Sequence, residues 1–159
     1  MAPKASSPVP TIYRLFFTYM DPLMCISGAY LSFFEPESIL ATTFPRTHNW
    51  AQVTPSHAVL LDQAGGAYVM MAFLMITMLR YTNDLNIWKI FQFSILMTDF
   101  ALYYAFWKGL KAQGRLGLES LRWEEWGTLG LVGSGTVLRT LFLLRVGVAK
   151  NIKRTKKRS

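Results

Sequence analysis

The sequence predicts an all-α protein, a four-helix transmembrane bundle with both termini in the cytosol. The chain of 159 residues is 52% hydrophobic, and its apolar residues gather in four long blocks instead of lining one face of amphipathic helices. All five tryptophans lie near the ends of these blocks or in the first loop, where the membrane interface favours indole rings. Basic residues crowd the C-terminal tail, which the positive-inside rule places in the cytosol.

The four spans are expected at about residues 12–34, 58–79, 87–107 and 126–148. Each is close to the roughly 20 residues that cross about 30 Å of hydrocarbon. They form one membrane domain, 12–148, between a cytosolic N-terminal segment, 1–11, and a basic cytosolic tail, 149–159. The first span is expected to be retained, because its apolar run is too long for a signal peptide and lacks a small-residue cleavage site.

In the first span, small and polar residues recur at spacings of four and three, as on one helix face. This face comprises Arg14, Thr18, Asp21, Cys25, Gly28 and Ser32. A carboxylate near the bilayer centre costs at least about 2.5 to 3.5 kcal/mol, so the face is expected to contact the other helices. Pro22 lacks the N–H that would bond the carbonyl of Thr18, which predicts a kink beside Asp21.

The other spans also carry polar residues. The second begins with Asp62 and Gln63, followed by small residues that allow close helix packing. The third places Gln92, Asp99 and Tyr103 on one face. These side chains are expected to face the interior of the bundle.

Depths estimated from the helical rise suggest one ion pair near the midplane, between Asp21 and Arg139. Such a pair fixes helix register without doing chemistry, and this structural role is favoured over a functional one.

The same depths place Asp62 beside Asp99 in the luminal half, with Glu124 or Glu125 at the mouth of the pair. Neighbouring carboxylates in a low dielectric hold a proton near neutral pH, as a general acid requires. Alternatively, Asp62 is hydrated from the lumen and Asp99 bonds a hydroxyl such as that of Tyr103.

No metal, disulfide, cofactor or nucleic-acid partner is expected. Cys25 is the only cysteine, and His48 and His57 are too few for a metal centre. No phosphate-binding glycine loop appears. The net charge of +8 resides largely in the tail and not on a folded polar surface.

The end of the tail gives a cellular address. The last four residues, Lys156, Lys157, Arg158 and Ser159, resemble the dilysine signal that returns membrane proteins to the endoplasmic reticulum. Such a signal must face the cytosol, in agreement with the topology. Alternatively, the basic tail only fixes orientation or touches anionic lipid.

Residues along nearly the whole chain match a known pattern. They are Pro8, Pro10, Tyr13, Arg14, Leu15, Phe16, Phe17, Tyr19, Asp21, Pro22, Gly28, Ala29, Tyr30, Gln63, Arg80, Trp88, Asp99, Tyr103, Trp123, Trp126, Gly127, Arg139 and Phe142. On these residues the chain resembles a family of small fungal four-helix integral membrane proteins of uncharacterised function. The resemblance implies fold and topology, but no activity.

The chain departs from that family at two places. Asp21 stands where glutamate is common, and Met75 and Ile76 stand where many members have an acidic residue. In architecture the chain is more distantly similar to the EXPERA group of sterol isomerases and sigma-2-type lipid binders. Fungal membrane terpene cyclases also use buried carboxylates in small bundles, so both likenesses are at the level of the fold.

The sequence therefore predicts an endoplasmic reticulum membrane protein with an intramembrane acidic cavity for a terpenoid, sterol or polyketide-like ligand. A cofactor-free isomerase or cyclase acting by proton transfer would use Asp62, Asp99 and Asp21 as catalytic residues. The expected ligand-binding residues are Tyr19, Gln63, Gln92, Tyr103, Trp107 and Arg139. The alternative is a non-catalytic protein that binds membrane lipid or scaffolds other membrane enzymes, with homo-oligomerisation open.

Overall fold

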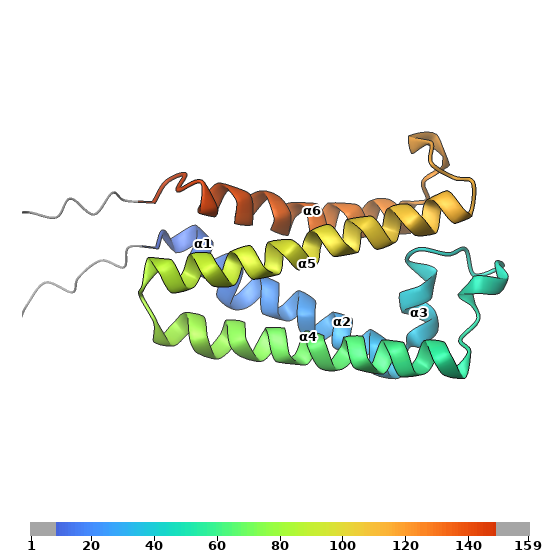
Figure 1. Ribbon diagram of the computed structural model, residues 1–159, viewed down its shortest axis with the longest axis horizontal. Helices are drawn as coiled ribbons and strands as arrows, with labels where there is room; N and C mark the ends of the chain where they lie inside the picture. The colour runs from blue at the N-terminus through green and yellow to red at the C-terminus, as the bar shows by residue number, and fades with distance from the viewer. Residues whose placement is uncertain (1–8, 149–159) are drawn as a thin grey trace, which may run out of the picture.

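The computed structural model describes residues 9–148, which form helices and no strands (Figure 1). The long helices are α2 (Asp21–Phe34), α4 (Pro55–Tyr81), α5 (Leu85–Ala112) and α6 (Trp123–Leu143). The short elements are α1 (Thr11–Leu15), the π-helical turn η1 (Phe16–Met20), α3 (Pro36–Ala41), η2 (Asn49–Ala51) and η3 (Leu118–Ser120). The predicted all-α class is confirmed.

Four helical segments correspond to the four predicted spans, with α1, η1 and α2 joined end to end in the first of them; in the fourth, α6 ends at Leu143, before the predicted end at residue 148. Within the described part of the chain, α4 alone has both the length and the apolar composition to cross a membrane. Membrane crossing by the other three segments therefore stays a prediction. The dilysine-like tail lies outside the described residues, so the predicted retrieval signal is not tested.

The ends of α4 and α5 are set by their caps. Thr54 precedes α4 and its hydroxyl accepts a hydrogen bond from the backbone N–H of His57 at 3.3 Å, with Pro55 at the first helical position. Asp84 caps α5 by accepting a hydrogen bond from the backbone N–H of Asn86 at 2.8 Å. The short turn 82–84 connects α4 to α5, and the two helices run antiparallel (Figure 1).

The helices pack as two antiparallel pairs, α2 with α4 and α5 with α6 (Figure 1). Glycine allows the close approach of α2 and α4, because a Cβ at Gly65 would lie 2.8 Å from Cζ of Phe33. At one end of the bundle, called the terminal end, α1 and the end of α6 lie beside the α4–α5 turn. At the other, called the cap end, lie α3, η2 and η3.

A packed core occupies the terminal end. It is built from Val9, Tyr13, Phe17, Met75, Leu79, Trp88, Ile95 and Phe142. Its rings contact one another, for example Phe17 and Phe142 with centroids 5.7 Å apart in an edge-to-face arrangement. This core joins the two helix pairs at their terminal end.

A π-helical turn stands where the sequence predicted a kink. The turn, Phe16–Met20, ends immediately before Asp21 and Pro22. Pro22 has no N–H to donate. Instead, Nη2 of Arg80 on α4 donates a hydrogen bond to the carbonyl of Thr18 at 3.3 Å. A side chain from the neighbouring helix thus bonds the carbonyl that the sequence left without its normal partner.

The outer surface of the bundle is largely apolar, whereas charged residues lie inside it. Large exposed side chains occur on all four long helices, among them Leu23, Ile26, Phe73, Ile90, Phe93, Phe100, Leu131 and Val137. The buried polar and charged side chains include Asp21, Gln92, Asp99, Glu125 and Arg139. This distribution is the reverse of that in a water-soluble bundle. Apolar surface of this extent marks contact with a membrane or with other proteins.

Candidate functional site

Arg139 on α6 bridges two carboxylates from different helices. Its Nη2 lies 2.6 Å from both carboxylate oxygens of Asp21 on α2, and its Nη1 donates to Oδ2 of Asp99 on α5 at 2.6 Å. The three side chains are at most 7% exposed. The predicted contact of Asp21 with Arg139 is confirmed, and Asp99 joins it. These residues are called the Asp–Arg–Asp cluster.

The backbone of α6 makes room for this cluster. A Cβ at Gly135, one turn before Arg139, would lie 2.5 Å from Nη1 of Arg139. Glycine therefore leaves the space that the guanidinium occupies. Gly135 thus accommodates the arginine of its own helix.

A cavity of about 490 Å³ lies against the cluster on the side of the cap end. Asp21, Asp99 and Arg139 line one end of it, and α3 with residues 42–44 lines the other. The remaining lining is mostly apolar and comes from α2, α4, α5 and α6. Its volume falls in the range of roughly 300 to 1,000 Å³ that is usual for small-molecule sites. Leu102 and Leu131 line the cavity and are also exposed, so it opens to the outer surface beside them.

One oxygen of Asp99 is open to this cavity. Oδ2 accepts hydrogen bonds from Arg139 and, at 3.1 Å, from the hydroxyl of Thr136. Oδ1 accepts none from residues 9–148, and it is not among their fully enclosed unpaired atoms. The cavity therefore offers a ligand one carboxylate oxygen that has no partner among the described residues.

A chain of hydroxyl groups leads from the cavity to the same carboxylate. The phenol oxygen of Tyr103, which lines the cavity, lies 3.2 Å from Oγ1 of Thr136. Oγ1 in turn lies within hydrogen-bonding distance of Asp99 and of the carbonyl of Val132, at 3.1 and 2.9 Å. The threonine has one hydroxyl proton and donates to one of them at a time. When Thr136 donates to Asp99, Tyr103 can donate to Thr136.

The structure brings together four of the predicted site residues, Asp21, Asp99, Tyr103 and Arg139, around one cavity. Asp62 is exposed on α4 and does not line that cavity. The expected pairing of Asp62 with Asp99 is not formed; Asp99 is bound to Arg139 instead.

Four other predicted ligand-binding residues do not line the cavity, and one of them, Gln92, is fully buried on α5. Gln63 is exposed beside Asp62. Trp107 is exposed at the cap end of α5, with its ring stacked 5.9 Å from that of Tyr104. Tyr19 is exposed on η1, and the guanidinium of Arg80 lies 4.6 Å from its ring centroid. None of these side chains can contact a ligand inside the cavity without moving.

Gln92 is fully buried on α5, between the turns of Trp88 and Ile95, and neither of its amide atoms has a hydrogen-bond partner within residues 9–148. Unsatisfied buried polar groups cost about 1 to 3 kcal/mol, and methionine has a similar length without them. We expect Gln92→Met to raise the midpoint of thermal unfolding in detergent micelles, followed by circular dichroism. Gln63→Met on the exposed face of α4 is the control, expected to change little. A lower midpoint for Gln92→Met would show that the amide has a stabilising partner.

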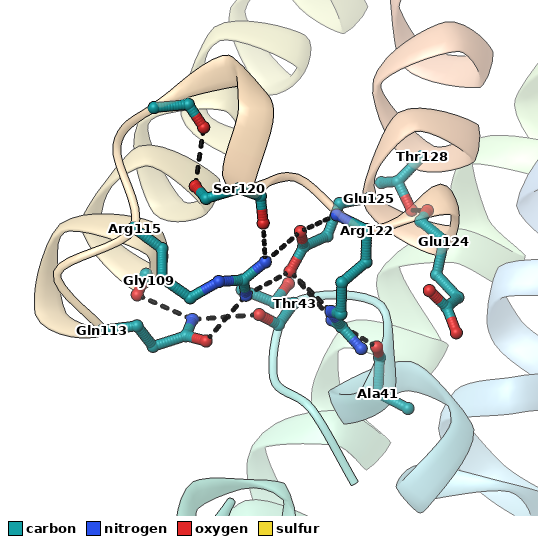
Figure 2. A network of polar contacts seen from close by, with 11 residues as sticks. Ala41, Thr43, Gly109, Gln113, Arg115, Ser120, Arg122, Glu124, Glu125 and Thr128 are labelled. Atoms are coloured by element: carbon teal, nitrogen blue, oxygen red, sulfur yellow. Dashed lines mark hydrogen bonds and ion pairs between the residues drawn. The ribbon is translucent and has the colours of Figure 1, made fainter.

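A second buried charge, Glu125, stands at the start of α6, just before the predicted fourth span (Figure 2). Its two carboxylate oxygens accept hydrogen bonds from Nη1 and Nη2 of Arg115, both at 2.9 Å. Nε and the backbone N–H of Arg122 also donate to it, at 3.0 and 2.7 Å. Glu124 or Glu125 was expected at the mouth of an acidic pair. Glu125 does not have this role, because its side chain is 0% exposed and bound by two arginines.

Arg122 and Gln113 extend the network to α3 and residues 42–44, which line the end of the cavity opposite the Asp–Arg–Asp cluster and are called its roof (Figure 2). Arg122 donates from Nη2 to the carbonyl of Ala41 at 3.0 Å, and Gln113 donates from Nε2 to the carbonyl of Thr43 at 3.0 Å. Arg115 also bonds the carbonyl of Ser120. Since Thr43 lines the cavity, the network ties its roof to the start of α6.

Burial alone would raise the pKa of Glu125, but the hydrogen bonds from Arg115 and Arg122 outweigh it. The pKa of Glu125 is consequently lowered from its ordinary value of 4.5. The carboxylate is therefore charged at neutral pH and holds both arginines in place.

A family model for a domain of unknown function, DUF7704, matches residues 6–149. The match covers nearly the whole chain, as the resemblance in the sequence predicted, and its description assigns no activity. Neither the curated proteins nor the solved structures give a match. The likeness to the EXPERA group stays a prediction.

Proposed function

We propose a function from the geometry of the structure. The chain belongs to the DUF7704 family, whose description assigns no activity. The protein is proposed to be a multipass membrane protein of the endoplasmic reticulum that binds an apolar small molecule beside the Asp–Arg–Asp cluster. The ligand is a terpenoid, sterol or polyketide-like molecule that carries a single polar group.

The distribution of side chains supports the membrane placement. Large apolar side chains face outward on all four long helices, and the charges of the cluster are enclosed between them. Hydrocarbon as the surrounding solvent accounts for both features. With 28 residues, α5 is about 42 Å long, which exceeds the roughly 30 Å of a bilayer core. The composition of α4 is in agreement.

The free Oδ1 of Asp99 at the end of an apolar cavity is the observation that carries the ligand assignment. An apolar molecule would fill the space lined by α2, α5 and α6. Its hydroxyl group would donate to Oδ1, which accepts no hydrogen bond from residues 9–148. The opening beside Leu102 and Leu131 would admit the ligand from the surrounding lipid.

The test compares an alcohol with the hydrocarbon that lacks its hydroxyl group. Full-length protein in detergent micelles is titrated with radiolabelled farnesol and farnesene, and with cholesterol and cholestane. We expect Asp99→Val to weaken alcohol binding about tenfold, the value of one hydrogen bond to a charged group. Binding of the matching hydrocarbon should persist, which shows that the cavity is intact.

The same substitution at Asp62 is the matched comparison. Asp62→Val should leave both affinities unchanged, because Asp62 is exposed outside the cavity. A loss of alcohol binding in Asp62→Val would favour the acidic pair expected from the sequence. Equal binding of alcohol by Asp99→Val and the unmodified chain would refute the proposed role of Oδ1.

The hydroxyl chain from Tyr103 through Thr136 to Asp99 favours a second candidate, a cofactor-free isomerase or cyclase. Two carboxyl groups face one guanidinium, so the cluster is neutral only when one carboxyl group holds a proton. In an isomerisation this proton would be given to one carbon of an alkene, and a carboxylate would remove a proton from another, leaving the protein unchanged.

Proton transfer has a distinct readout in deuterated water. Candidate terpenoids incubated with the catalyst would gain deuterium, detected by mass spectrometry, and Asp99→Asn would abolish the gain. Ser32→Ala should retain it, because Ser32 donates to the carbonyl of Gly28 within its own helix and does not line the cavity. Binding without deuterium uptake would identify a non-catalytic carrier.

A further inference from the structure

A second cavity, of about 440 Å³, lies at the terminal end of the bundle. It is lined by Thr11, Arg14, Leu15, Thr18, Tyr19 and Arg80. None of these residues lines the larger cavity, so the two are separate. Two of the six are arginines and none is acidic. This arginine cavity therefore has a local excess of positive charge.

Arg80 is held in position by two contacts. Its Nη2 donates to the carbonyl of Thr18 at 3.3 Å, and its guanidinium lies 4.6 Å from the centroid of the Tyr19 ring. A guanidinium has five N–H donors, and one of them is used here. The others remain for a ligand, on a group whose orientation is already set.

Arg14 supplies the second charge. It is half-buried, and within residues 9–148 neither Arg14 nor Arg80 forms an ion pair. Thr11 and Tyr19 also line the cavity, and their hydroxyl groups make no hydrogen bond within that range. Two guanidinium groups and two hydroxyl groups form the kind of donor set that binds phosphate, because several charge-assisted hydrogen bonds converge on one anion.

The surroundings indicate where the rest of such a ligand would lie. Leu15 and Tyr19 are themselves more than half exposed. The exposed apolar surface continues on either side of them, with Ile12 on α1 and Leu23 on α2. A phosphate in the arginine cavity would thus be followed by a surface suited to acyl chains.

We propose that the arginine cavity binds the phosphate group of an anionic phospholipid. The assignment of the ligand to a phospholipid rests on the membrane placement proposed above, whereas the recognition of a phosphate group by Arg14 and Arg80 does not. Free inorganic phosphate is the other source of the same chemistry, and the experiment separates the two.

The experiment is native mass spectrometry of the full-length chain in a neutral detergent. The probes are dioleoylphosphatidic acid, dioleoylphosphatidylcholine and inorganic phosphate. We expect one molecule of phosphatidic acid to be retained at least about tenfold more strongly than phosphatidylcholine. Retention of inorganic phosphate with equal strength would support the phosphate site and assign it to a soluble ligand instead of a lipid.

Matched variants locate the binding. Arg14→Gln and Arg80→Gln should each lower phosphatidic acid retention about tenfold, and Lys89→Gln at the same end of the bundle should not. Arg80 also bonds Thr18, so its loss could disturb folding; Arg14 forms no side-chain hydrogen bond or ion pair within residues 9–148 and keeps the test decisive. Retention unchanged in Arg14→Gln, or lowered equally in Lys89→Gln, would overturn the proposal. So would failure to retain any of the phosphate probes.

Discussion

Arg139→Met is expected to lower the free energy of unfolding by about 3 to 5 kcal/mol, because it leaves two buried carboxyl groups without their partner. Asp21 and Asp99 are each at most 7% exposed, so water cannot replace the guanidinium without opening the bundle. The measurement is reversible unfolding in mixed micelles with increasing SDS, followed by tryptophan fluorescence. Thermal unfolding in one detergent gives an independent check.

A triple variant separates lost pairing from lost packing. Asp21→Asn, Asp99→Asn and Arg139→Met together remove all three charges and keep similar volumes. Buried ion pairs replaced as a unit are often neutral in stability, so most of the loss should be recovered. Lys89→Met controls for the general effect of removing a cation. If Arg139→Met alone unfolds like the unmodified chain, the cluster does not stabilise the fold.

Glu125→Gln is expected to lower the free energy of unfolding by about 2 to 3 kcal/mol at neutral pH. The change removes a charge that Arg115 and Arg122 share, yet both arginines are 22 to 23% exposed and regain some hydration. Glu124→Gln is the matched control, because the side chain of Glu124 makes no hydrogen bond or ion pair within residues 9–148.

The loss should also depend on pH, because the pKa of Glu125 in the folded chain is below its ordinary value of 4.5. A group with a lowered pKa stabilises the fold above its unfolded pKa, and this contribution is lost as pH falls through the folded pKa. The difference between Glu125→Gln and the unmodified chain should be constant from pH 6 to 8 and shrink below about pH 4.5. A difference that is the same at every pH would contradict the assigned interactions.

The contact of Asp21 with Arg139 could be predicted because two opposite charges at similar depth in apolar helices have few other partners. The partner of Asp99 could not. The depth of a residue in the membrane does not say in which direction its side chain points around the helix axis. In α4, Gly65, Ala72 and Met75 are buried, whereas Asp62 is exposed. Choosing between Asp62 and Arg139 as the neighbour of Asp99 required the packed arrangement of the helices.

The network around Glu125 was missed for a different reason. Arg122 and Glu125 carry opposite charges three residues apart, a spacing at which side chains can meet on a helix, and this local signal was present in the sequence. The contribution of Arg115 depends on the path of the loop through η3, which no periodic pattern describes. The cavity was likewise expected only in outline, since its roof comes from α3 and the following loop.

The π-helical turn at Phe16–Met20 makes the first helical path sensitive to its length. One residue added or removed here would rotate everything upstream by about 100° relative to α2. Tyr13, whose phenol donates to the carbonyl of Val146 at 2.9 Å, would then leave its place against α6 while Asp21 kept its own. In evolutionary terms, this stretch can exchange side chains far more readily than it can gain or lose a codon.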